Sequence, residues 1–179
     1  PQGEASKSFK ILESVLRQML DFGMGRGDLV VAVGGGVVGD LAGFAASIYM
    51  RGIDFINCPT TTLSMIDSSI GGKTAVDLGD TKNIVGAFWQ PKLVIVDPDT
   101  LSTLPRRHFI NGLAEAVKAS LLADPELFAI FENGDVDAQI GEIICRSLRF
   151  KKSIVEQDET EQGMRKALNF GHTIGHGIE

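Results

Sequence analysis

The sequence contains few cysteines, only Cys58 and Cys145 in 179 residues. They lie far apart, and neither has a second cysteine at C-x-x-C spacing. A disulfide-stabilised fold or a cysteine-type zinc site needs more cysteines at closer spacing. The sequence therefore argues against both, and we expect two buried free thiols.

Long apolar runs and clusters of basic residues are also missing. No segment approaches the roughly 18 consecutive apolar residues that a membrane-spanning helix needs, and the N-terminus lacks a basic patch followed by an apolar run. Lys and Arg number 17 against 23 Asp and Glu, a net charge of -6, and they form no stripe that would bind nucleic acid. We therefore expect a cytoplasmic protein that binds neither membranes nor nucleic acid.

The chain is rich in core-forming residues and in glycine. Hydrophobic residues make up 44% of it, which indicates a folded domain rather than a disordered segment. The 21 glycines cluster between Gly23 and Gly86. Because glycine has no side chain, this cluster indicates a backbone that approaches a ligand closely.

The first hundred residues predict an α/β layer that binds a nucleotide. Apolar residues recur at helical spacing in the first segment, with Ser6 or Ser8 as its N-cap. The run over 29–33 is typical of a parallel strand buried on both faces. Alternating strands and helices favour the α/β class. The predicted elements are helices over 7–20 and 41–50 and strands over 29–33, 55–58 and 93–96.

The rest of the chain predicts a functional loop and an incomplete all-α domain. Residues 68–90 have few apolar repeats and many Gly, Asp and Lys residues, so we expect a functional loop without regular structure. We divide the chain into an α/β domain over 1–103 and a helical domain over 104–179. Helices are predicted over 113–122, 125–131, 140–150 and 167–178, the last without a stop signal before Glu179.

Gly34, Gly36 and Gly39 match G-x-G-x-x-G between a predicted strand and a predicted helix, where bare amides bind pyrophosphate. The alternative is a tight turn without a ligand. The usual ribose-binding acid ends the second strand, whereas Asp54 precedes it, so we do not expect a standard Rossmann ribose contact. Asp40 is either a helix cap or a ligand contact, and its spacing favours the cap.

His172 and His176 are four residues apart on a predicted helix, so both rings project from one face, as in a two-histidine metal site. Thr173 replaces the glutamate of H-E-x-x-H, which argues against a zinc peptidase. The alternative is two helix-face histidines that bond to neighbours. Glu115 is likewise either a metal ligand on an apolar face or half of an i,i+3 ion pair with Lys118.

Basic and amide side chains lie near both the glycine-rich segment and the two histidines. They are Lys73, Lys82 and Asn83 in the glycine-rich stretch and Lys151, Arg165 and Asn169 ahead of the histidines. In an acidic chain this grouping indicates a small anionic substrate with a phosphate or carboxylate group. The alternative for each residue, taken singly, is an exposed side chain that contributes only to solubility.

Together these segments resemble the 3-dehydroquinate synthase family, NAD- and metal-dependent cyclases of the shikimate pathway. The matching segments keep the family's order over nearly the whole chain: 34–40, 59–77 with its Asp-Ser-Ser-Ile-Gly-Gly-Lys-Thr run, Lys82-Asn83, 112–118 and 168–179. The family's domain is about twice as long, so the resemblance implies missing N-terminal strands and a missing C-terminal helical part. It also implies a sugar-phosphate substrate, 3-deoxy-D-arabino-heptulosonate 7-phosphate, which is converted to 3-dehydroquinate and phosphate with NAD and zinc, cobalt or another divalent metal.

The resemblance assigns roles residue by residue. The implied NAD contacts are Glu4, Lys7, Gly36, Val37, Val38, Gly39, Asp40, Thr60, Thr61, Lys73, Lys82, Thr100, Leu101, Ser102 and Thr103. The implied zinc ligands are Glu115, His172 and a histidine beyond Glu179. The implied catalytic residues are Lys73, Lys118, Lys151, Arg165, Asn169 and His176. The further implied substrate contacts are Asp67, Asn83 and Arg51, the last from the neighbouring subunit of a homodimer.

Three other functions stay open at this point. Another sugar-phosphate cyclase would share the NAD and zinc sites, and a metal-dependent polyol dehydrogenase of the same superfamily would release NADH. A non-catalytic nucleotide-binding fragment is the third, because part of the implied metal site lies beyond the chain. Lys151, Arg165 and Asn169 favour the dehydroquinate synthase branch.

Overall fold

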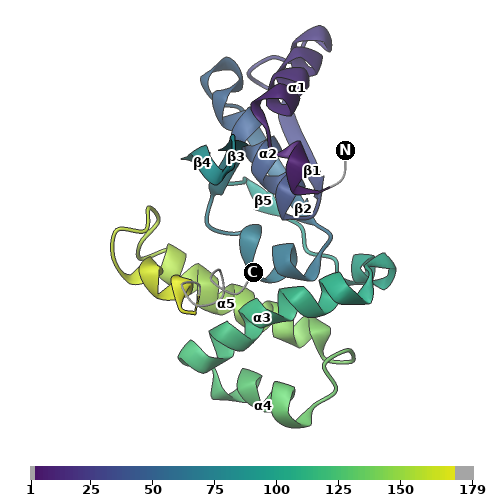
Figure 1. The fold of residues 1–179 in the computed structure, drawn as a ribbon, viewed down its shortest axis with the longest axis vertical. Helices are drawn as coiled ribbons and strands as arrows, with labels where there is room; N and C mark the ends of the chain where they lie inside the picture. The colour runs from purple at the N-terminus through teal and green to yellow at the C-terminus, as the bar shows by residue number, and fades with distance from the viewer. Residues whose placement is uncertain (1–2, 172–179) are drawn as a thin grey trace.

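The chain folds into an α/β part followed by a helical part (Figure 1). The computed structural model describes residues 3–171. The elements are η1 (Glu4–Ser6), α1 (Phe9–Asp21), β1 (Leu29–Gly34), α2 (Gly36–Ile48), η2 (Tyr49–Arg51), β2 (Asp54–Pro59), η3 (Ser64–Ser68), β3 (Lys73–Leu78), β4 (Thr81–Phe88), β5 (Leu93–Val94), η4 (Pro98–Thr103), α3 (Arg106–Ala123), α4 (Pro125–Asn133), α5 (Ile140–Val155) and η5 (Met164–Asn169).

The α/β part is built on a parallel sheet in the order β1-β2-β5. α2 connects β1 to β2, and its Phe44 shares one hydrophobic core with Val30 and Phe55 of these strands. α1 adds Leu12 to this core and begins at Ser8, whose hydroxyl accepts a hydrogen bond from the Ile11 amide. The predicted strands and helices of this part are therefore confirmed, although α2 begins at Gly36, well before residue 41.

The prediction that the first strand is buried on both faces is wrong. α2 covers the face of β1 that carries Val30 and Ala32. On the opposite face Leu29, Val31 and Val33 are 46%, 54% and 62% exposed. β1 lies at the edge of the sheet, and no element within residues 3–171 buries these three side chains.

The prediction of a loop without regular structure over 68–90 is also wrong. β3 and β4 form an antiparallel hairpin in which Lys73 pairs with Phe88 and Val76 pairs with Val85. Val76 and Val85 pack into the core of the α/β part, and Gly79 turns the chain with a φ of 59°. The segment is therefore a rigid element supported by the first core.

The helical part has a second core, which contains Leu127 and Ile143. The predictions for 113–122, 125–131 and 140–150 are confirmed by α3, α4 and α5, each longer than predicted. The prediction over 167–178 is not borne out as far as Gly171, because this part ends a 3-10 helix and continues into a turn. Its remainder lies outside the described residues. None of the helices within residues 3–171 is long and apolar enough to span a membrane.

Candidate active site

The element η3 joins the two cores at the candidate site. It is a short π-helix directly after β2, and π-helical turns occur often at functional sites. Its Met65 and Ile66 are buried in the second core, whereas Asp67 and Ser68 line a cavity. The side chains of one turn therefore anchor the helical part and also form the wall of the site.

A cavity of about 550 Å³ lies between η3, the hairpin and α5. Six of the residues implied by the resemblance line it, although they are spread over more than a hundred positions in the sequence. They are Asp40, Asp67, Lys73, Asn83, Lys151 and Arg165. The fold thus brings together cations that attract an anion and carboxylates that accept hydrogen bonds from hydroxyl groups.

Lys151 is a buried cation in the wall of this cavity, 7% exposed. Its ammonium donates to the Asp67 carboxylate at 2.7 Å and to the Asp67 backbone oxygen at 2.6 Å. Burial lowers the pKa of Lys151 and the nearby Arg165 adds to this, while Asp67 opposes it. Groups perturbed in this way concentrate at functional sites.

Lys7 connects the N-terminal segment to the same cavity. It is buried, and its ammonium donates to Asp40 at 2.8 Å and to the Asn83 side chain. Burial by itself would lower the pKa of Lys7, but Asp40, Glu4 and Asp77 outweigh it and raise that pKa. Burial raises the pKa of Asp40, an effect that Lys7 only partly offsets.

The interpretation of Asp40 as a helix cap is wrong. α2 begins at Gly36 with Gly35 as its N-cap, so Asp40 lies inside the helix, beyond the reach of the free amides. Its carboxylate instead pairs with Lys7 and lines the cavity. This places it among the candidate ligand contacts.

The polypeptide after α5 closes the site through Arg165. Arg165 is 2% exposed and donates to the backbone oxygens of Glu159 and, at 2.9 Å, Gly71. Its guanidinium also lies 5.7 Å from the centre of the Phe88 ring. A cation so fully enclosed is positioned by the fold before any anion binds.

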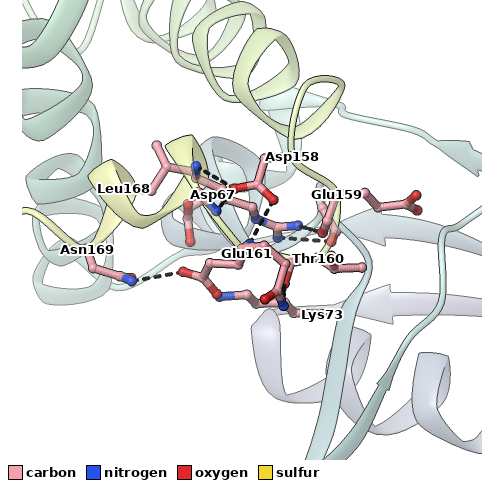
Figure 2. A network of polar contacts seen from close by, with 12 residues as sticks. Asp67, Lys73, Asp158, Glu159, Thr160, Glu161, Leu168 and Asn169 are labelled. Carbon is pink, nitrogen blue, oxygen red and sulfur yellow. Dashed lines mark hydrogen bonds and ion pairs between the residues drawn. The ribbon is translucent and has the colours of Figure 1, made fainter.

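Glu161 is a site residue that the sequence reasoning missed. Its carboxylate pairs with Lys73 and accepts a hydrogen bond from Asn169 at 2.8 Å (Figure 2). Burial by itself would raise the pKa of Glu161, but the bonds from Lys73 and Asn169 hold it below the usual value. Glu161 lies in a polar segment without a motif, so nothing in the sequence distinguishes it from a surface glutamate.

Glu115 and Lys118 form an i,i+3 ion pair on α3, which was the alternative to a metal-ligand role for Glu115, and Lys118 also donates to the Leu168 backbone oxygen at 2.6 Å. A small second cavity places both residues beside Asp67 and Lys151. Within residues 3–171 no group of three or more His, Cys, Asp and Glu side chains could hold a metal ion. His172 and His176 lie outside the described residues.

The N-terminus of α2 gathers other implied cofactor contacts. Gly36, Val37, Val38 and Gly39 make up its first turn, and no side chain caps it at Gly35. The backbone amide of Thr60 donates to Gly34, while a Cβ added at Gly35 would lie 3.0 Å from the Thr61 methyl group. The amides of Val38 and Gly39 donate to the Gly35 oxygen, so Gly36 and Val37 are the residues whose amides can bind a phosphate group here.

The structure leaves a few implied residues away from the main cavity. Lys82 and Arg51 are exposed and do not line it. Glu4 does not line the cavity and pairs with Lys7 at 3.4 Å, and Asn169 does not line it and donates to Glu161. Thr100, Leu101, Ser102 and Thr103 form η4, where Leu101 and Ser102 line a separate cavity of about 490 Å³.

Two family models match the chain end to end. The N-terminal model of 3-dehydroquinate synthase covers residues 1–111, and the C-terminal model covers residues 112–179. The chain belongs to the 3-dehydroquinate synthase family. A 3-dehydroquinate synthase of Clostridium perfringens is 51% identical to it over 181 aligned residues, which include 99% of the chain and 52% of the relative.

Solved structures of related cyclases share the fold. A 2-epi-5-epi-valiolone synthase from Streptomyces hygroscopicus with NAD+ and Zn2+ bound matches with a TM-score of 0.91 at 33% identity, over 99% of this chain and 52% of that one. A 2-deoxy-scyllo-inosose synthase complexed with carbaglucose-6-phosphate, NAD+ and Co2+ matches with a TM-score of 0.90 at 34% identity, over 99% and 51%. The chain thus spans about half the length of the relatives it matches.

Proposed function

We propose that the intact protein containing this chain converts 3-deoxy-D-arabino-heptulosonate 7-phosphate to 3-dehydroquinate and phosphate. The observation that carries the proposal is the cavity in which Lys73, Lys151 and Arg165 face Asp67 and Asn83. The 51% identity to a dehydroquinate synthase supports this substrate over those of the cyclases that are 33% and 34% identical.

The cations have separate parts in this proposal. Arg165 is enclosed and presents a fixed guanidinium for a phosphate or carboxylate of the substrate. Lys73 is half exposed and exchanges its pairing with Glu161 for the incoming anion. Lys151 and Asp67 orient hydroxyl groups of the sugar, and the lowered pKa of Lys151 suits it to proton exchange with them.

NAD is the proposed cofactor, because the uncapped first turn of α2 fits a pyrophosphate group. Gly36 and Val37 would supply the amides, and Thr60 and Thr61 flank them. NAD would supply reversible hydride transfer when bound. Lys7 keeps Asp40 in place beside this turn, which supports a role for both residues in binding the cofactor.

A divalent metal, zinc or cobalt, is the second proposed cofactor. Glu115 is the proposed ligand within residues 3–171, and His172 and a later histidine would complete the set. Glu115 is paired with Lys118 and lies beside Lys151 and Asp67, two residues that line the candidate substrate site. Replacing Glu115 by Ala should abolish zinc retention, measured by elemental analysis; retained zinc would contradict the assignment.

The proposed assembly is a homodimer in which Arg51 reaches the substrate of the neighbouring subunit. Arg51 is exposed, and Met50 and Arg51 have φ values of 51° and 72°, a left-handed backbone that costs free energy for residues other than glycine. Light scattering should give the mass of a dimer. Arg51→Ala should raise the KM while the dimer persists.

The test of the activity is phosphate release by the intact protein with the heptulosonate phosphate, NAD and zinc. We expect phosphate without net formation of NADH at 340 nm, because NAD is regenerated in each turnover. Phosphate from glucose 6-phosphate alone would instead identify another cyclase. Net NADH from glycerol, with no phosphate from the heptulosonate, would identify a polyol dehydrogenase. Inactivity of the intact protein toward all three would favour a non-catalytic nucleotide-binding protein.

A further inference from the structure

Three buried side-chain oxygens lack a hydrogen-bond partner within residues 3–171: those of Thr62, Ser68 and Ser69. Burying a hydroxyl without a partner is unfavourable, so each calls for a physical explanation. Of the three residues, Ser68 alone lines the main cavity. Its hydroxyl is therefore positioned to bond to something that enters the cavity.

The position of Ser68 links the two halves of the candidate site. It is the last residue of η3, next to Asp67, whose carboxylate holds Lys151. On its other side lies the first turn of α2, because a Cβ added at Gly36 would be 3.0 Å from the Ser68 Oγ. The hydroxyl thus lies between the uncapped helix N-terminus and the charged wall of the cavity.

We propose that Ser68 is a ligand-positioning residue whose hydroxyl donates a hydrogen bond to a phosphate or ribose oxygen of the dinucleotide at the N-terminus of α2. The inference rests on the proposed function and adds a contact that the motifs did not indicate. A serine hydroxyl rotates freely and can donate and accept, so it suits an oxygen that also receives backbone amides. The absence of a side chain at Gly36 leaves the space that this contact needs.

A purely structural role for Ser68 makes the opposite prediction. A hydroxyl that stabilised the unliganded fold would have a partner there, and its removal would lower the melting temperature. The Ser68 Oγ has none within the described part of the chain. We therefore expect Ser68→Ala to leave the melting temperature of the unliganded protein unchanged or to raise it, because an unsatisfied buried group is removed.

The test is a calorimetric titration of the intact protein with NAD+, combined with thermal unfolding without ligand. Ser68→Ala should raise the Kd for NAD+ about tenfold, as expected for one lost hydrogen bond to a charged or strongly polar oxygen. Ser69→Ala is the matched control. The Ser69 hydroxyl is likewise buried and unpartnered within residues 3–171, but Ser69 does not line the cavity, so its variant should bind NAD+ within twofold of the wild type.

A second variant and a second ligand keep the result unambiguous. Ser68→Cys retains the shape of the side chain but donates weakly, so it should lose affinity as Ser68→Ala does. An unchanged Kd for NAD+ in both variants would overturn the inference, as would a loss of affinity that accompanies a lower melting temperature. Weakened binding of the sugar phosphate alone would assign Ser68 to the substrate and overturn it too. A wild-type protein that does not bind NAD+ would overturn the proposed function itself.

Discussion

At the scale of single residues, Gly71 decides where Arg165 can lie. Gly71 has a φ of 106°, and a Cβ there would overlap the Arg165 guanidinium that donates to the Gly71 oxygen. Gly71→Ala therefore combines backbone strain with displacement of a buried cation. We expect the free energy of unfolding, measured with urea, to fall by about 2–3 kcal/mol and anion affinity to fall with it.

Gly79 provides the matched control for this prediction. It has a φ of 59° at the hairpin turn, and an added Cβ would have no atom within 4 Å. Gly79→Ala therefore introduces strain without a clash, and we expect a loss of about 1 kcal/mol with anion affinity unchanged. Equal losses of stability and affinity in both variants would show that the Arg165 contact is not responsible.

At the scale of elements, the turn over 158–165 depends on one carboxylate. Asp158 accepts backbone hydrogen bonds from Gln162, Gly163 and Arg165 at 2.7–2.9 Å. These bonds, led by the one from Arg165, hold the pKa of Asp158 below its usual 3.8. The carboxylate therefore orients the start of η5, which carries Arg165.

The sign of the pH effect follows from this lowered pKa. Because the folded-state value lies below the unfolded one, Asp158 stabilises the fold fully above the unfolded value and loses this contribution as the pH falls through the folded value. We expect Asp158→Asn to unfold at lower urea concentration than the wild type at pH 6, with the difference shrinking below about pH 3.8. A difference that stays constant down to pH 2.5 would contradict the assignment.

The elements also show which parts of the fold are readable from sequence. α1, α3 and α5 are long and periodic, and β1 and β2 are apolar runs, so pattern alone predicts them. The β3–β4 hairpin lacks such a signal because its register depends on contacts across strands. At Gly86, for example, an added Cβ would overlap the Thr74 backbone oxygen, so this glycine is required by close strand packing rather than by a ligand.

The candidate site likewise contains some residues that the sequence predicts and others that it does not. Lys73, Lys151 and Arg165 were singled out because basic residues near glycine and histidine motifs are unusual in an acidic chain. Which carboxylate pairs with which cation does not follow from sequence spacing, because Lys73 and Glu161 are far apart in the sequence and come from different parts of the fold. Glu161 and Ser68 therefore become visible as site residues only in three dimensions.

At the scale of the whole molecule, residues of both the α/β part and the helical part line the cavity, and polar contacts join the two parts there. Lys151 of α5 bonds to Asp67 of η3, and Arg165 bonds to Gly71 ahead of the hairpin. Gln90, after β4, donates to Glu159 at 2.9 Å. These contacts are polar, and several use groups that an anionic ligand would also engage. We therefore expect ligand binding and the docking of the two parts to be coupled.

This coupling predicts which elements become protected from amide hydrogen exchange when ligands bind. The sugar phosphate, added at a hundred times its Kd, should stabilise the intact protein by about 2.7 kcal/mol. Amide hydrogen exchange should slow in both α2 and α5, because the cavity is lined from both sides. NAD+ alone should slow exchange mainly in α2, whose first turn is its proposed site.

Lys151→Met is the control for this measurement, because it retains the length of a buried side chain and removes the charge that holds Asp67. The variant should keep the protection of α2 by NAD+ and lose most of the protection of α5 by the sugar phosphate, since the cation that joins the two parts is gone. If the sugar phosphate protected α5 equally in the variant and the wild type, or protected only one part in the wild type, the cavity would not be the element that couples them.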